Sequence, residues 1–206
     1  MTNRFDEAAL TWDENLERLK MTKVISEAII NNIHPSKQWN ALDYGCGTGS
    51  LSFFMHDLLG DITLADESEG MLNVLQTKIE KSEVNNMHPV KLNLVADEYT
   101  QHHDIIYTAM ALHHIIDTGN IIRKFHSLIN KDGYLCIADL VSEDGLFHSH
   151  IKNFDGHNGF DMEELRSILV NEGFTEVKSE ICFVMERKQE DGTSMKYPIF
   201  LMTGKK

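Results

Sequence analysis

Proline, cysteine and positive charge are all scarce in this sequence. Its 206 residues include three prolines and three cysteines, and 19 Lys and Arg stand against 32 Asp and Glu, which gives a net charge of −13. Three widely spaced thiols, at Cys46, Cys136 and Cys182, exclude a disulfide framework and fit buried thiols in a reducing compartment. Binding to nucleic acid or to an anionic membrane requires clustered Lys and Arg, and no such cluster is present. We therefore expect neither nucleic acid nor a membrane as a partner.

Long hydrophobic runs are absent as well. No uninterrupted apolar run approaches the length of a membrane-spanning helix, and residues 1–6 lack the basic and apolar regions of a secretion signal. On these grounds the sequence predicts a cytoplasmic protein. Its length suits one well-buried α/β domain, whereas the choice between a monomer and a homodimer stays open.

Apolar runs typical of strands alternate with segments of helical period. The predicted strands cover residues 39–44, 62–65, 90–95, 105–108 and 134–140, and the predicted helices between them cover residues 49–59, 68–81 and 120–129. Such alternation predicts right-handed crossovers and a parallel sheet that helices cover on both faces.

The two ends of the chain carry further patterns. Residues 11–33 have near-helical spacing that stops at Pro35, which predicts one helix or a broken pair of helices. Ser68 and Asp161 are placed to cap the N-termini of two later helices, the second of which ends at Gly173. Alternating apolar residues around a turn signal then predict an antiparallel hairpin, with its strands and turn at residues 177–186, 197–203 and 190–192.

The turn after the first predicted strand has the composition of a ligand-binding loop. An acid, Asp43, is followed by Gly45, Gly47 and Gly49, which let the backbone approach a ligand closely at the start of a helix. The dinucleotide fingerprint needs a glycine or alanine at the sixth position from its first glycine, where this chain has Ser50, and the phosphate-binding loop needs a lysine that is missing here. The loop therefore suits a ligand with a carboxylate, an amine and a ribose better than a pyrophosphate.

Asp43-Tyr44-Gly45-Cys46-Gly47-Thr48-Gly49 resembles the first motif of class I S-adenosylmethionine-dependent methyltransferases, and the similarity extends over most of residues 6–203. The resemblance implies a Rossmann-like three-layer α/β sandwich with a seven-stranded, mostly parallel sheet and an antiparallel C-terminal hairpin. We expect a single domain over residues 1–206. Its parts would be a helical cap, a cofactor-binding core, a substrate lid, and a terminal helix with the hairpin, at residues 1–35, 36–140, 141–160 and 161–206.

The same resemblance implies where S-adenosylmethionine binds. The loop backbone would wrap the methionine portion, with Asp43 acting on its ammonium group. Asp66 closes the second strand and would accept hydrogen bonds from both ribose hydroxyls, while Met71 would pack against the adenine. The predicted cofactor residues are Asp43, Gly45, Cys46, Gly47, Gly49, Asp66, Glu67, Met71, Asp97, Glu98, Thr108 and Ala109.

Two of these pairs follow later strands. Asp97 and Glu98 resemble the motif whose acid receives the adenine amine, and the two adjacent acids leave open which of them does so. The stretch from Asp104 to His114 is similar to the family segment that ends in paired histidines. By that match, the Thr108 carbonyl and Ala109 would face the ammonium and sulfonium region.

Histidines are the candidate bases for the acceptor side. Methyl transfer by in-line displacement needs alignment and a deprotonated acceptor, which an imidazole can provide. We name His113 and His148 as candidate catalytic residues, with His150 and His157 in the same lid segment, and note that consecutive His113 and His114 cannot both face one pocket from a regular element. No histidine spacing matches a closed zinc site, so no metal is expected. Near the N-terminus, Trp12 would wall the acceptor pocket and Arg18 would pair with the cofactor carboxylate.

Taken together, these patterns predict a methyltransferase of a small organic acceptor. Two alternatives remain at this point. A protein that binds S-adenosylmethionine as a sensor or assembly factor would need the same loop, because displacement requires no invariant catalytic side chain. A nicotinamide-dependent oxidoreductase shares the type of sheet but is disfavoured by Ser50.

Overall fold

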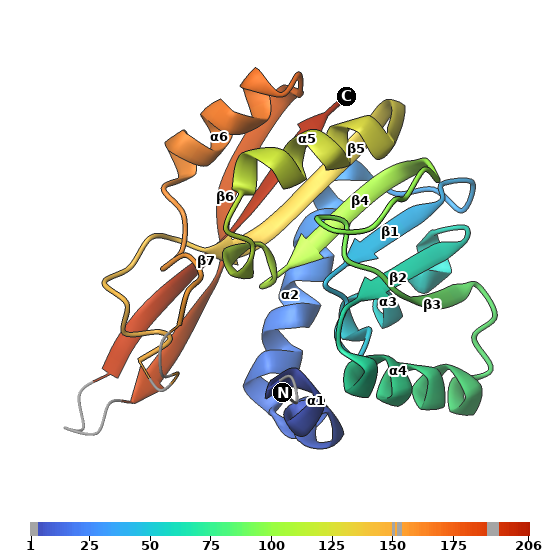
Figure 1. Cartoon of the computed structure of the whole chain (residues 1–206), viewed down its shortest axis with the longest axis horizontal. Helices are drawn as coiled ribbons and strands as arrows, with labels where there is room; N and C mark the ends of the chain where they lie inside the picture. The colour runs from blue at the N-terminus through green and yellow to red at the C-terminus, as the bar shows by residue number, and fades with distance from the viewer. Residues whose placement is uncertain (1–3, 150, 152–153, 189–193) are drawn as a thin grey trace.

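The computed structural model describes residues 4–149, 151, 154–188 and 194–206, which form a seven-stranded sheet (Figure 1). The strands are β1 (Ala41–Tyr44), β2 (Ile62–Asp66), β3 (Met87–Lys91), β4 (His103–Ala109), β5 (Ile129–Leu140), β6 (Thr175–Lys188) and β7 (Ser194–Lys205). Their order is β3-β2-β1-β4-β5-β7-β6. The first five strands run parallel, and β7 pairs antiparallel with both β5 and β6. The predicted sheet and its antiparallel hairpin are confirmed, whereas the turn predicted at 190–192 lies outside the described residues.

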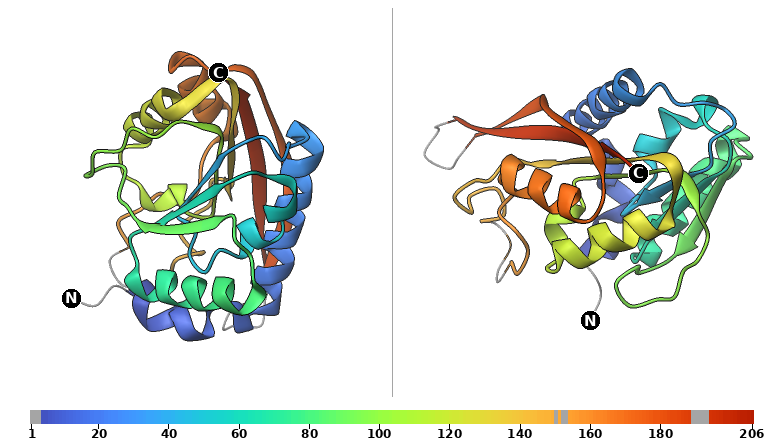
Figure 2. Two further views of the ribbon diagram at one scale, coloured as in Figure 1. Left: turned by 90° about the vertical axis from the view of Figure 1, so that its right-hand side faces the viewer. Right: turned by 90° about the horizontal axis from the view of Figure 1, so that it is seen from above.

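Helices cover both faces of the sheet. They are α1 (Arg4–Ala8), α2 (Leu16–Ile33), α3 (Ser50–Phe53), α4 (Glu69–Ser82), α5 (Thr118–Leu128) and α6 (Met162–Asn171), with 3-10 helices η1 (Ala9–Glu14), η2 (His56–Leu58) and η3 (Leu112–His114). Neighbouring residues of β1 point to opposite faces, so Ala41 packs with α2, α3 and α4 while Leu42 packs with α5 and α6. The right-hand view of Figure 2 shows α2 on one side of the sheet and α5 and α6 on the other. The result is a three-layer α/β sandwich.

Side-chain caps fix where two predicted helices begin. The Ser68 hydroxyl oxygen accepts a hydrogen bond from the Met71 backbone N–H, and the Asp161 carboxylate accepts from the N–H of Glu163. Each cap satisfies a backbone donor that the first helical turn would otherwise leave without a partner. Both predicted helix starts are therefore confirmed.

The N-terminal segment is a broken helix pair. α1 and η1 precede α2, whose start is capped by the Asn15 side chain accepting from the Arg18 N–H. α2 ends with His34 in the left-handed conformation, immediately before Pro35. The contact between α1 and α4 is held by Asp6, whose carboxylate accepts hydrogen bonds from the Ser68 hydroxyl and the Gly70 N–H at 2.6 and 2.9 Å.

The third strand lies earlier in the chain than its apolar pattern predicts. β3 pairs with β2 over Met87–Lys91, and the chain leaves the sheet at Leu92, whereas the prediction was 90–95. Leu92 and Leu94 produce the apolar pattern because both are buried just beyond the strand. Pro89 is tolerated inside β3 because this strand is at the edge of the sheet, where a missing N–H costs no ladder bond.

Among the described residues, no helix is long and apolar enough to cross a membrane.

Candidate functional site

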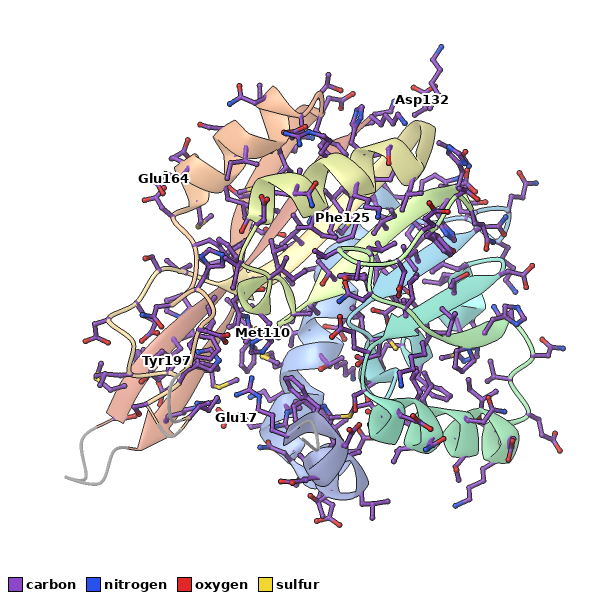
Figure 3. The ribbon with its side chains drawn as sticks, in the orientation of Figure 1. Glu17, Met110, Phe125, Asp132, Glu164 and Tyr197 are labelled. Carbon is purple, nitrogen blue, oxygen red and sulfur yellow. The ribbon has the colours of Figure 1, made fainter. Side chains whose placement is uncertain are left out.

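A cavity lies where the parallel strands end. Its volume is about 820 Å³, and it is lined by the segments that follow β1 to β4, by α1, η1 and α2, by the chain after β5, and by β6. Figure 3 places Met110 just past the end of β4, near β7, which carries Tyr197, and near the start of α2, which carries Glu17. Open parallel sheets bind ligands at the carboxyl ends of their strands, so this cavity is the candidate site.

The turn after β1 has a backbone shape that glycine permits. Gly45, Gly47 and Gly49 have positive φ angles of 72°, 53° and 74°. A Cβ at Gly45 would overlap Ala111, and one at Gly49 would overlap Leu75, so packing also requires glycine at these two positions. At Gly47 a Cβ would meet nothing closer than 3.9 Å, and this residue lines the cavity. Gly47 therefore has room for a Cβ, which would just contact Trp12 and Met71, and its backbone is on the cavity wall where a ligand can approach it. Gly49 does not line the cavity.

Asp66 joins the loop to the end of β2. Its two carboxylate oxygens accept hydrogen bonds from the backbone N–H groups of Gly47 and Ser68, both at 2.8 Å. Burial raises the pKa of Asp66, and these hydrogen bonds oppose that rise. Because a carboxylate has about four lone-pair positions, both oxygens can still accept from hydroxyl groups in the cavity. Glu67 follows on the cavity wall with an exposed side chain.

Asp43 is the buried acid of the site. One of its oxygens accepts from the Ser52 hydroxyl at 2.7 Å, and the Tyr107 hydroxyl lies 2.7 Å from the Ser52 oxygen. Burial raises the pKa of Asp43 to about 7, with the Ser52 hydrogen bond lowering it and the charge of Asp66 raising it. A nearby ammonium group would favour the ionised form, so Asp43 is suited to a cationic ligand group.

Cys46 and Met71 also line the cavity, as the sequence predicts for residues beside the cofactor. Burial raises the pKa of the Cys46 thiol well above its usual value. The thiol is therefore protonated near neutral pH and is not an activated nucleophile. Met71 is 1% exposed and offers an apolar surface beside Gly47.

The segment after β3 is where placement and prediction differ. Asp97 and Glu98 do not line the cavity; instead the Asp97 carboxylate accepts a hydrogen bond from the Asn93 N–H at 2.8 Å and stabilises a turn. Asn93 lines the cavity. The physical reason is the earlier end of β3, which brings Asn93 rather than the later acids to the edge of the sheet. The first polar residue after Leu92 is the sequence signal that could have identified it.

At the end of β4, one of the two predicted residues lines the cavity and the other does not. Ala109 lines the cavity, whereas Thr108, whose carbonyl was predicted to face the cofactor, is 1% exposed and is not among the lining residues. This follows from the alternation of side chains along a strand.

His113 forms a buried pair with Asp139 at the end of β5. The Nδ1 of His113 lies 2.6 Å from one Asp139 oxygen, and the other oxygen accepts from the His113 backbone N–H at 3.1 Å. The side chains are 2% and 0% exposed. Because an ionised carboxylate only accepts hydrogen bonds, Nδ1 carries the proton and Nε2 is left as an acceptor. The sequence analysis did not single out Asp139, whose signal is an acid inside an otherwise apolar strand.

The other histidines have distinct surroundings. His113, His114 and His148 all line the cavity. The expectation that consecutive His113 and His114 could not both face one pocket is therefore wrong, because both lie on the short 3-10 turn η3 and not on a regular helix or strand. His148 stacks on Phe154 with ring centroids 3.9 Å apart. Burial, followed by the charges of neighbouring groups including His113 and Arg4, lowers the pKa of His114 to about 2. His157 does not line this cavity, and its Nε2 lies 3.0 Å from the Ile115 carbonyl oxygen. His150 lies outside the described residues.

His113, His114 and His148 together form what we call the histidine cluster. One nitrogen from each ring lies within 4.8 Å of the others, a geometry that could hold a metal ion although no sequence spacing indicates it. The Arg4 guanidinium lies 3.3 Å from Nε2 of His114, and a fixed positive charge at that distance disfavours a bound dication. The arrangement fits hydrogen bonding to a ligand and proton transfer better than metal binding.

Arginines complete the cavity wall. Arg18 lies over the ring of Trp12, 3.8 Å from its centroid, and both residues line the cavity. Their roles toward the cofactor carboxylate and the acceptor stay predictions. Arg4 and Arg187 also line it, and the sequence analysis identified neither of them. Arg187 comes from β6, and only the antiparallel hairpin brings it to the ends of the parallel strands.

The chain is similar in sequence to known methyltransferases. A methyltransferase domain family matches residues 35–193. An uncharacterised methyltransferase of Schizosaccharomyces pombe is 24% identical over 170 residues, which cover 75% of this chain and 60% of that protein. The ubiquinone/menaquinone biosynthesis C-methyltransferase UbiE of a Shewanella species is 33% identical over 103 residues, covering 48% of this chain and 41% of that protein. The chain thus spans about half the length of these curated relatives.

Solved structures share the fold. A Haloferax volcanii complex of the Trm112 methyltransferase activator with a putative methyltransferase contains a chain similar over 100% of this one and 98% of its own length, with a TM-score of 0.78 and 13% identity. Phosphoethanolamine N-methyltransferase 2 of Haemonchus contortus, bound to S-adenosyl-L-methionine, is similar over 88% of this chain and 52% of its own, with a TM-score of 0.72 and 13% identity. Given the family match and the cavity at the strand ends, the chain belongs to the class I S-adenosylmethionine-dependent methyltransferases.

Proposed function

We propose that this chain binds S-adenosylmethionine in the cavity and transfers its methyl group to a small organic acceptor. When bound, the cofactor supplies an electrophilic methyl group on a sulfonium. The observation that carries the proposal is the position of Gly47: it lies on the cavity wall with a positive φ, and its N–H donates a hydrogen bond to Asp66. A positive-φ glycine facing a cavity, tied to an acid at the end of the next strand, matches a ligand with an amino-acid end and a ribose.

The residues would divide the cofactor between them. The loop from Gly45 to Gly47 and the carboxylate of Asp43 would hold the amino-acid end, and Arg18 would pair with its carboxylate. Asp66 and Glu67 would hold the ribose, and Met71 and Asn93 would border the adenine. All of these residues line the cavity.

His113 is the proposed base. Its Nδ1–H is fixed by Asp139, so Nε2 can accept a proton from an O–H or N–H of the acceptor as the new bond to the methyl group forms. Asp139 is a positioning residue, which sets the tautomer and stabilises the imidazolium that results. His148, the second predicted catalytic candidate, would border the acceptor through its stacking on Phe154.

The volume of the cavity and the names of two relatives support a small acceptor. Its volume of about 820 Å³ lies within the range of small-molecule sites, roughly 300–1,000 Å³. The names of the Shewanella and Haemonchus relatives describe methyl transfer in quinone biosynthesis and to phosphoethanolamine, which are small acceptors. We propose no metal requirement, because Arg4 lies against the histidine cluster.

Turnover separates this proposal from a cofactor-binding sensor. Purified protein is incubated with S-adenosylmethionine and with pools of small molecules that offer a hydroxyl, an amine or a nucleophilic carbon atom, and the release of S-adenosylhomocysteine is measured. Each reaction is run with and without a chelator, which tests for a metal requirement. Acceptor-dependent release that survives the chelator supports the enzyme. Tight cofactor binding without release from any pool would instead favour the sensor.

A further inference from the structure

Three arginines on the cavity wall share an unusual setting. Each guanidinium carbon lies over an aromatic ring, with distances to the ring centroids of 4.6 Å for Arg4 over Phe5, 3.8 Å for Arg18 over Trp12 and 3.8 Å for Arg187 over Phe147. All three line the cavity, and their side chains are neither fully buried nor fully exposed. Stacking of this kind holds a guanidinium in place and leaves the N–H groups at its edge available.

None of these three guanidinium groups is ion-paired within the described part of the chain. The arginines that do form ion pairs there are Arg123 and Arg166. Within the same described residues, the Arg187 guanidinium donates a hydrogen bond to the Phe147 carbonyl oxygen at 2.9 Å, and that of Arg18 donates one to the Trp12 carbonyl oxygen at 2.7 Å. A guanidinium has five N–H donors, so most of this capacity is unused. The chain has far more acids than bases, which makes unpaired arginines in a cavity notable.

The acids of the cavity lie on the other side or are already engaged. Asp43 and Asp66 flank the glycine loop, and Asp13 is paired with Lys78 at 2.7 Å. Asp117, which also lines the cavity, accepts a hydrogen bond from the Asn120 N–H at 3.0 Å. Asp155 acts on Arg4, and Glu17 and Glu143 act on Arg187, as charges without a described ion pair to these arginines. The basic side of the cavity, which we define by Arg4 and Arg187, therefore lies near acids without being paired with them.

The basic side lies next to the proposed acceptor position. Arg4 lies 3.3 Å from Nε2 of His114. At the other end, Arg187 stacks on Phe147, whose ring centroid is 4.8 Å from that of His148. Burial lowers the pKa of both arginines, and burial with the charge of Arg187 lowers that of Arg18, so a bound anion would relieve unfavourable electrostatics. S-adenosylmethionine brings only one carboxylate, which Arg18 would receive.

We infer that the methyl acceptor carries an anionic group, a carboxylate or a phosphate. Arg187 binds this group beside the histidine cluster, and Arg4 attracts it as a second positive charge. This inference rests on the proposed function for the identity of the acceptor half. Arg187 is the principal anchor, because its planar fork matches both anions and its single carbonyl partner leaves the remaining donors open. Arg4 adds a second positive charge across the cluster.

Calorimetric titration of matched ligands tests the inference. Benzoate and phenyl phosphate, which separate the carboxylate from the phosphate, are compared with neutral benzyl alcohol, each titrated with and without saturating S-adenosylhomocysteine. The preferred anion should bind at least about tenfold more tightly than the alcohol, in line with a charge-assisted hydrogen bond. Arg187→Gln should abolish that preference and Arg187→Lys should restore part of it. The control Arg123→Gln, an exposed arginine paired with Glu172, should retain it.

Two outcomes would overturn the inference: equal or undetectable binding of the anions and the alcohol to the unmodified protein, or a preference that survives in Arg187→Gln. The anion preference is measured in cofactor-free protein as well, so it stands or falls independently of cofactor binding. Failure of S-adenosylhomocysteine to bind would count against the proposed function alone. Equal melting temperatures of the three variants establish that they are folded.

Discussion

Single side chains decide where charge lies in this cavity, and Asp43 is the one that makes binding depend on pH. Burial raises its pKa to about 7, so near neutrality the free protein holds a mixture of neutral and ionised Asp43. A cofactor ammonium prefers the ionised form. Affinity for S-adenosylhomocysteine should therefore increase as the pH rises from 6 to 8, by up to about tenfold per pH unit below the pKa.

The stability of the free protein should move in the opposite direction. Because the folded-state pKa of Asp43 exceeds its usual value of 3.8, the native state binds more protons between these two values, and the contribution of Asp43 to stability falls as the pH rises through that range.

The variant Asp43→Asn tests whether Asp43 causes the pH dependence of cofactor binding. It should flatten the pH dependence of binding measured by calorimetry. A dependence that persists unchanged in this variant would show that another group titrates.

Asp66 has two roles, because it also holds the Gly47 N–H. Asp66→Ala should weaken affinity for S-adenosylhomocysteine by about 2 kcal/mol, the scale of lost charge-assisted hydrogen bonds. The matched control is Asp61→Ala. Asp61 is an exposed aspartate just before β2, and its carboxylate is hydrogen-bonded to His88. Unchanged affinity in Asp66→Ala would disprove the ribose assignment.

The His113–Asp139 pair should affect chemistry rather than cofactor binding. For a hydroxyl or amine acceptor, His113→Gln should lower kcat by about a hundredfold or more with little change in cofactor affinity, because the base is lost. Asp139→Asn should lower kcat and change the pH profile of the rate, since an amide can hold the wrong tautomer. His102→Gln is the control and should retain kcat, because His102 is exposed and does not line the cavity. Full activity of His113→Gln would exclude it as the base.

Among the structural elements, the loop after β1 is the one that sequence describes best. Its three glycines were recognised as a loop that brings the backbone close to a ligand, and all three have positive φ angles. The helix starts at Ser68 and Asp161 follow from local capping chemistry. These features depend on neighbours a few residues away. They could therefore be predicted without knowing the tertiary structure.

The parts that prediction missed depend on long-range packing. The bounds of β3 were predicted too late in the chain, because buried leucines beyond a strand look the same in sequence as leucines within it. As a result, Asp97 was predicted at the cavity, where the structure has Asn93. Asp139 meets His113 through the pairing of β5 with β4, and Arg187 reaches the cavity through the pairing of β6 with β7 and of β7 with β5. Asp139 stands out locally as an acid in an apolar strand, but its partner does not follow from the local pattern, and no local pattern distinguishes Arg187 from other residues of an amphipathic strand.

The glycine loop supplies a prediction at this scale. Gly47→Val should abolish binding of S-adenosylhomocysteine while the protein remains folded, because its side chain would stand in the cavity instead of overlapping the core. The control Gly145→Val imposes the same backbone penalty, at φ 89°, away from the cavity wall. Circular dichroism and calorimetry on both variants separate strain from occlusion. A folded Gly47→Val that binds normally would contradict the loop assignment.

On the scale of the whole molecule, the chain is an acidic three-layer sandwich with one basic region inside its cavity. Ligand binding to the native state alone should stabilise the entire domain by about 2.7 kcal/mol at a hundred times the dissociation constant. For a chain of this size the melting temperature should then rise by about 5–10 °C. S-adenosylmethionine and S-adenosylhomocysteine should produce this shift in a thermal melt, and NAD should not. A shift with NAD alone would favour nicotinamide chemistry.

The most direct measurement is a crystal structure of the chain with S-adenosylhomocysteine. The account predicts the ligand in the cavity at the strand ends, with its amino-acid portion against Gly45–Gly47 and its ribose hydroxyls on the Asp66 carboxylate. Its sulfur should face the histidine cluster. A ligand bound elsewhere, or a loop that closes off the space at Gly47, would contradict the account.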